Sequence, residues 1–123
     1  MYQRAIRGAI TVDNDTEASI REAVILLINK IKELNRYKEE DISHVIFTLT
    51  DDIKSVYPAK IAREVYSSWK YVPMMCFNEM KIENSLTKCL RIMIVINTEL
   101  AQNEIKHVYL KGAEKLRKDL IQQ

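Results

Sequence analysis

The most constraining feature of the sequence is an apolar run that contains one full charge. Residues 87–98 are rich in β-branched side chains, which predicts a central β-strand covered on both faces. Arg91 lies inside this run. Burying a guanidinium costs on the order of several kcal/mol unless an anion or good acceptors meet it. Two interpretations stay open at this point: Arg91 pairs with a local glutamate or reaches solvent, or it binds an anionic or oxygen-rich ligand.

Composition excludes several classes of function. The chain has 123 residues, 47% hydrophobic and 29% charged, which predicts a single globular domain over residues 1–123. A net charge of +2 with scattered basic residues does not favour nucleic acid. No run is long enough for a membrane span, and the first residues do not resemble a signal peptide. Cys76, Cys89, His44 and His107 lack the spacing of a metal site or a disulfide framework. We therefore expect a reduced, cytoplasmic protein without a metal.

The hydrophobic pattern changes period several times along the chain, which predicts a small α/β domain. Thr16 is the expected N-cap of the first helix and Pro58 suits the first turn of the second. Strands are predicted at residues 4–12, 42–50, 71–76, 87–98 and 106–110, and helices at 16–35 and 59–66. A helical turn is predicted at residues 101–104. The polar tail at 113–123 is either a short helix or a mobile segment.

Period-2 alternation assigns side chains to faces. In residues 4–12, Arg7 shares a face with small residues, opposite Ile6 and Ile10. In residues 42–50, one face carries Val45, Phe47 and Leu49, and the other carries Ile42, His44, Ile46 and Thr48. We interpret His44 as structural.

A set of polar side chains remains as the candidate site: Arg7, Arg63, Arg91, Lys60, Glu79, Cys76 and Tyr109. Lys60 and Arg63 share a helix face, where they either attract an anion or are simply solvated. The set has no evident nucleophile–base pair and no Gly-rich phosphate loop. An enzyme built on it would depend on cationic recognition and electrostatic stabilisation.

Several motifs occur in order over residues 4–120: Ile6-Arg7-Gly8-Ala9, Val56–Lys60 with Arg63-Glu64, Trp69–Pro73 with Cys76 and Glu79-Met80, Lys88–Arg91, and His107–Leu110 with Leu116-Arg117. Together they resemble the monofunctional chorismate mutases of the trimeric pseudo-α/β-barrel class. The resemblance implies an α+β fold with a mixed β-sheet flanked by helices. It also implies a homotrimer with active sites between subunits, which converts chorismate to prephenate without a cofactor.

The resemblance also implies roles for single residues. Arg91 would donate to the ether oxygen of the breaking bond, so that its partner is substrate rather than a local carboxylate. Arg7 and Tyr109 would bind carboxylates, and Glu79 with Cys76 would hydrogen-bond the ring hydroxyl. The remaining pocket residues would be Tyr57, Ala59, Lys60, Arg63, Met74, Met75 and Leu116, with Arg117 in a tail that closes over the site.

Four departures from the family pattern stand out. Tyr57 replaces a common Phe, Met75 replaces a small polar residue, and Asn84-Ser85 replaces a Gly-Gly turn. One extra residue lies between Glu64 and Trp69. The alternative hypothesis is a non-catalytic trimeric protein that binds a small carboxylate ligand. A weaker one is an imine deaminase of similar fold, whose motifs are not recognisable here.

Overall fold

The structure, a computed structural model, describes residues 1–120. Its strands are β1 (Tyr2–Thr11), β2 (Ile42–Leu49), β3 (Met74–Asn78), β4 (Cys89–Thr98) and β5 (Val108–Leu110). Its α-helices are α1 (Glu17–Asn35) and α2 (Pro58–Val65). Short 3-10 turns are η1 (Glu39–Asp41), η2 (Ser67–Trp69), η3 (Gln102–Glu104), η4 (Lys111–Lys115) and η5 (Lys118–Leu120). The predicted α+β class is confirmed.

The five strands form one mixed sheet in the order β3-β2-β4-β1-β5. β4 lies at the centre and is antiparallel to both neighbours, whereas the edge strands β3 and β5 join in parallel. The prediction that residues 87–98 contain the central strand is therefore confirmed, with the strand beginning two residues later, at Cys89.

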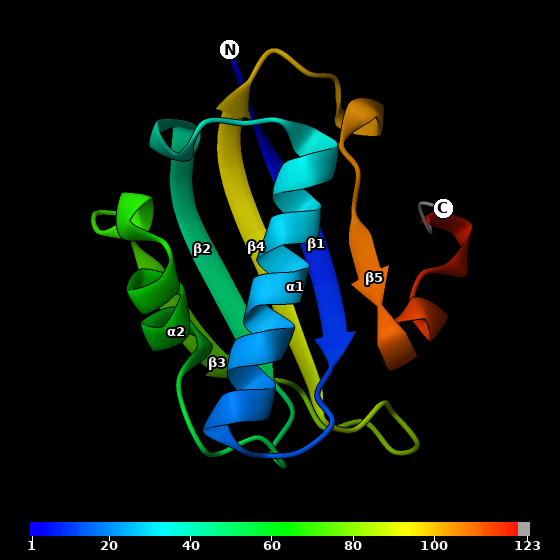
Figure 1. Ribbon diagram of the computed structural model, residues 1–123. Helices are drawn as coiled ribbons and strands as arrows, with labels where there is room; N and C mark the ends of the chain where they lie inside the picture. Colours follow the sequence, from blue (N-terminus) through cyan, green and yellow to red (C-terminus); the bar gives the residue numbers. More distant parts are fainter. Residues whose placement is uncertain (121–123) are drawn as a thin grey trace.

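Both helices pack on one face of the sheet, with α1 running across it (Figure 1). The Thr16 side chain caps α1 by accepting from Ser19 N at 3.2 Å, and Pro58 begins α2, as predicted. Arg21 of α1 pairs with Glu64 of α2 at 2.7 Å. Leucine and isoleucine side chains fill the layer between the helices and the sheet: Ile6, Ile10, Leu27, Ile31, Leu90, Ile94 and Ile96 are all fully buried.

The other face of the sheet has no α-helix over it in residues 1–120. Of the described elements, η4 covers one end of this face, where Ala113 packs against Ala9 and Tyr109. Arg91 and Met93 stay half-buried on it. The prediction that both faces of β4 are covered thus holds only in part for the single chain. Cys89 and Val95 are buried on this face, but Arg91 and Met93 are not, because the helices reach only the side chains at alternate positions.

A β-bulge in β2 places Ile42 on the opposite face from the one predicted. The pairing of β2 with β4 shifts between Ile42 and His44. Ile42 therefore lies opposite Ile96 and is 8% exposed in the core, not on the face with His44. The extra residue in β2 reverses the alternation at this point.

Other boundaries also differ from those predicted. β3 covers Met74–Asn78 rather than 71–76, and β5 begins two residues later than expected. The predicted tail forms η4 and η5, while its residues 121–123 lie outside the described part. Among residues 1–120, no helix has the length and apolar character that crossing a membrane requires.

Candidate active site

One row of side chains crosses the sheet on the face without helices. The register places Tyr109 beside Ala9, Ala9 opposite Arg91, and Arg91 opposite Thr48. Ala9, which lies between the two, is 1% exposed and packs against Ala113. Arg7 lies opposite Met93, one diagonal step from Arg91. Arg7 and Arg91 therefore share this face of the sheet.

Arg91 has a carboxylate beside it. Its Nε lies 3.1 Å from Oε2 of Glu79, and both side chains are 25% exposed. The same Oε2 accepts a hydrogen bond from Oγ1 of Thr48 at 2.7 Å. The expectation that Arg91 lacks a local carboxylate partner is wrong for this structure, because the chain after β3 returns Glu79 to the end of β2, where its N–H donates to Leu49 O.

The ion pair does not satisfy Arg91 fully. Its Nε is buried and has no hydrogen-bond acceptor within the described residues, so the N–H does not point at the nearby Glu79 oxygen. Together with Thr48, Ile46 and Arg7, these groups line a cavity of about 210 Å³. A buried N–H without an acceptor is costly, which favours a ligand oxygen at this place.

Tyr109 provides a second buried donor. The residue is 5% exposed, and its hydroxyl also has no partner among residues 1–120. Cys89 and Leu116 pack around the ring. Burial raises the pKa of the Cys89 thiol, and the charge of Arg91 opposes this shift. Cys89 is therefore a neutral packing residue beside Arg91.

A separate cleft lies where α2 meets β3. Tyr57, Lys60 and Cys76 line it, and its volume is about 470 Å³. Cys76 lies next to Phe47 in the register and so faces the helices. Burial raises the pKa of its thiol, while a hydrogen bond from the Ala59 backbone and the charge of Arg63 oppose that rise. A neutral thiol at this position can serve as a weak hydrogen-bond donor.

The predicted site residues thus form two groups within one chain. Arg7, Arg91 and Glu79 line one cavity, with Tyr109 in the same row, and Leu116 packs beside Tyr109. The second group lies at α2 and β3: Tyr57, Ala59, Lys60, Arg63, Met74 and Cys76. Met75 is 61% exposed and follows the pleat onto the face without helices. Glu79 and Cys76, to which the resemblance assigns the ring hydroxyl together, line different cavities within one chain.

Two residues that contact the candidate site have no role predicted from the sequence. Thr48 hydrogen-bonds Glu79, and Nδ1 of His107 accepts from the backbone N–H of Arg7 at 2.9 Å. Strand alternation already placed Thr48 on the correct face, but the missing information was the register that brings it opposite Arg91.

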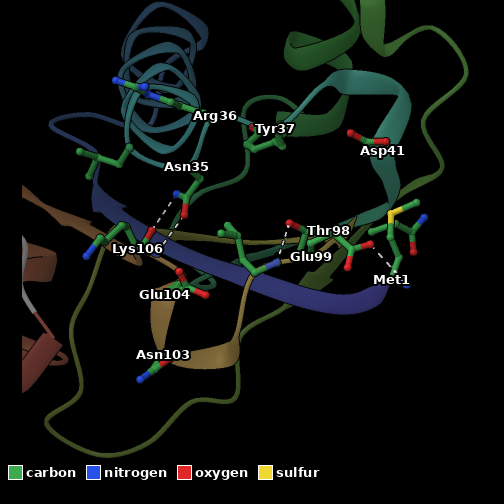
Figure 2. Close-up of a pocket in the computed structure, with 13 residues that line it drawn as sticks. Met1, Asn35, Arg36, Tyr37, Asp41, Thr98, Glu99, Asn103, Glu104 and Lys106 are labelled. Atoms are coloured by element: carbon green, nitrogen blue, oxygen red, sulfur yellow. Dashed lines mark hydrogen bonds and ion pairs between the residues drawn. The ribbon is translucent and has the colours of Figure 1, made fainter.

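A larger cavity, of about 720 Å³, lies elsewhere (Figure 2). Asn35, Arg36, Glu99 and Lys106 are among the residues that line it. None of the predicted site residues belongs to this lining. Size alone therefore does not identify the site, and the buried donors of Arg91 and Tyr109 favour the face without helices as the candidate.

The geometry defines a class: a domain that presents cationic and phenolic donors, next to a carboxylate, to a small anionic ligand. Residues 3–120 match the family model described as chorismate mutase type I. Chorismate mutase AroH of Bacillus subtilis (strain 168) is 43% identical over 120 residues, which cover 98% of this chain and 94% of that protein. Chorismate mutase AroH of Thermus thermophilus is 39% identical over 118 residues, covering 95% of each. A solved chorismate mutase from Clostridium thermocellum is 40% identical, with a TM-score of 0.85 over 90% of this chain and 97% of that one.

The chain therefore belongs to the type I chorismate mutase family. The predicted resemblance is confirmed, and so is the expectation of an isomerase. The alternative of a non-catalytic carboxylate-binding protein has no support in these comparisons.

Proposed function

We propose that this chain converts chorismate to prephenate, on the route to phenylalanine and tyrosine, at sites shared between neighbouring subunits of a cytoplasmic homotrimer. The observation that carries the proposal is the pair of buried donors, Arg91 Nε and Tyr109 Oη, which have no acceptor within the described residues. They lie in one row across the sheet and flank a small residue. Oxygen atoms of a bound substrate would satisfy both.

The chemistry suits such a site. One C–O bond breaks while one C–C bond forms within the same molecule, so that no nucleophile, base or cofactor is required. The protein must hold the chair-like conformer with its reacting carbons close together. Arg91 donates to the ether oxygen, where negative charge develops, and a preplaced donor of this kind contributes on the order of 10²–10³ in rate.

The other residues of this group fix the substrate. Arg7 and Tyr109 bind its carboxylates, and Glu79 accepts from the ring hydroxyl. Thr48 holds Glu79 in place through the 2.7 Å hydrogen bond. Glu79 also lies beside the Arg91 guanidinium. The substrate therefore meets a carboxylate and a guanidinium that are already oriented before it binds.

The separation of the two groups supports sites that are shared between copies of the chain. Tyr57, Lys60 and Cys76 line a cleft at the α2–β3 edge, while Arg7 and Arg91 occupy the face without helices. A substrate that touches both groups must lie between two copies. The exposure of apolar side chains on or near β3 favours such a contact: Met75 is 61% and Phe77 47% exposed.

Two measurements test the proposal. Purified protein, in buffer with a chelator, is expected to consume chorismate and form prephenate. A folded protein without turnover would contradict the activity. One chain has a mass of 14.4 kDa. Light scattering coupled to size-exclusion chromatography is expected to give three times that mass.

Subunit mixing tests the shared site separately. Arg91→Ala and Arg63→Ala are each expected to be nearly inactive, yet trimers reassembled from their mixture regain some intact sites. The matched control mixes Arg91→Ala with Arg7→Ala, which damage the same group and cannot complement each other. Equal recovery in both mixtures, or none in either, would count against sites built from two subunits.

A further inference from the structure

A backbone hydrogen bond beside the site ends on a titratable ring. β5 pairs with β1 from Gly8 and Val108 onward. The N–H of Arg7 lies just before this ladder begins and donates instead to Nδ1 of His107, at 2.9 Å. The imidazole therefore replaces the carbonyl that a longer β5 would supply.

This hydrogen bond fixes the protonation state and the tautomer of the His107 ring. Nδ1 can accept only when it carries no proton, so His107 must be neutral with its proton on Nε2. The charged groups that face it are cations: Arg4 and Arg7 on β1, and Arg117 on the tail. The lining of the adjacent cavity of about 240 Å³ includes no carboxylate among the described residues. Burial, followed by the charges of Arg7 and Arg117, lowers the pKa of His107.

The chain next to His107 is held from the other side by a buried amide. Nδ2 of Asn35 donates to Lys106 O at 2.9 Å, and its Oδ1 accepts from Lys106 N at 2.9 Å (Figure 2). Nδ2 also donates to Ile31 O within α1. Asn35 is 7% exposed. Because α1 anchors the residue before it, His107 cannot easily follow a movement of β1.

We propose that His107 is a positioning residue that holds the backbone of Arg7 in its substrate-binding place, and only in its neutral form. This inference rests on the proposed function, in which Arg7 binds a substrate carboxylate. A proton on Nδ1 would face the N–H of Arg7, remove the hydrogen bond and add a cation beside Arg7. Since Arg7 contacts the substrate in the ground state and the transition state alike, KM rises more than kcat falls.

The direction of the pH effect follows from the lowered pKa. The ring favours the neutral form in the folded protein, so the arrangement is complete above the ordinary value of 6.5 and is lost as the pH falls through the folded pKa. We expect the KM for chorismate to rise roughly tenfold over this acid range, which is the size of effect that one hydrogen bond supports.

Two variants separate positioning from packing. His107→Asn keeps an acceptor, because Oδ1 of asparagine can take the place of Nδ1, but it does not titrate. It is expected to keep KM within about threefold of wild type at pH 8 and to lose the acid rise. His107→Ala has no acceptor and is expected to raise KM roughly tenfold at pH 8. The matched control is His44→Asn, which removes the other histidine, whose Nδ1 lies near Ser43 Oγ. This variant is expected to keep the rise of KM at acid pH. An acid rise that persists in His107→Asn, or is absent from wild type, overturns the proposal.

A measurement without substrate keeps the two proposals distinguishable. The ¹⁵N shifts of the imidazole are expected to show the proton of His107 on Nε2 at pH 8 and a pKa below 6.5. A proton on Nδ1, or a pKa at or above 6.5, overturns the role of His107 even if the enzyme is active. Wild-type protein that shows the expected shifts but does not convert chorismate contradicts the proposed function instead.

Discussion

Thr48→Val removes the hydroxyl that holds Glu79 while keeping the shape of the side chain. The Oγ1–Oε2 distance of 2.7 Å is that of a charge-assisted hydrogen bond. Such bonds contribute about 1.5–3 kcal/mol. Glu79 is 25% exposed, so water competes for the carboxylate and the lower end applies. About 1.5 kcal/mol corresponds to a loss of roughly tenfold in kcat/KM.

The assay follows chorismate absorbance at several substrate concentrations, with thermal unfolding measured on the same samples. Thr48→Ser is the matched control, because it keeps the hydroxyl and loses only the methyl group. It is expected to stay within about threefold of wild-type kcat/KM. The reasoning fails if Thr48→Val is as active as wild type, or if Thr48→Ser loses as much activity as Thr48→Val.

Further predictions concern the donor, a close contact and an acid-sensitive loop. Arg91→Lys is expected to lower kcat by about 10²–10³ while circular dichroism stays unchanged, because an ammonium cannot reproduce the donor geometry of Arg91; near-normal turnover would refute this role. Gly8→Ala is expected to reduce the free energy of unfolding in urea by about 1–3 kcal/mol, because the added Cβ would lie 2.9 Å from Ile31 Cδ1 in the core; an unchanged midpoint would show that the core yields. Oδ1 of Asp15 accepts from the N–H groups of Lys54 and Ser55, which lowers its pKa from 3.8, with Lys54 as the largest cause. Asp15→Ala is thus expected to be less stable than wild type in urea at pH 7, with the difference disappearing as the pH falls through the folded pKa of Asp15. A difference that does not change with pH would contradict the assignment.

Local signals in the sequence predicted most of the elements. Thr16 and Pro58 mark helix starts by chemistry that acts within one turn, and the structure has both. The alternation in β1 placed Arg7 correctly opposite the core, because a strand without a bulge keeps its period. The extra residue near Ile42 broke the same rule in β2, and no local signal marks it.

The arrangement of the site depended on contacts between distant parts of the chain. The residue pattern made Arg91 and Glu79 candidates, and the resemblance to a family gave them roles, but their ion pair comes from the path of the chain after β3. The link between His107 and Arg7 spans 100 residues. It arises because β5 is short, which is a property of the sheet rather than of either residue.

The sheet face without helices has a consequence for every measurement on the proposed homotrimer. When assembly covers that face, part of the folding free energy becomes a function of protein concentration. Each tenfold dilution then removes about 0.9 kcal/mol per chain, two-thirds of the value for one factor of ten. Enzyme assays run at nanomolar protein would therefore examine a less stable species than unfolding experiments at micromolar protein. Substitution of an exposed apolar side chain such as Met75 would then change activity in dilute assays by weakening assembly, without any contact to the substrate.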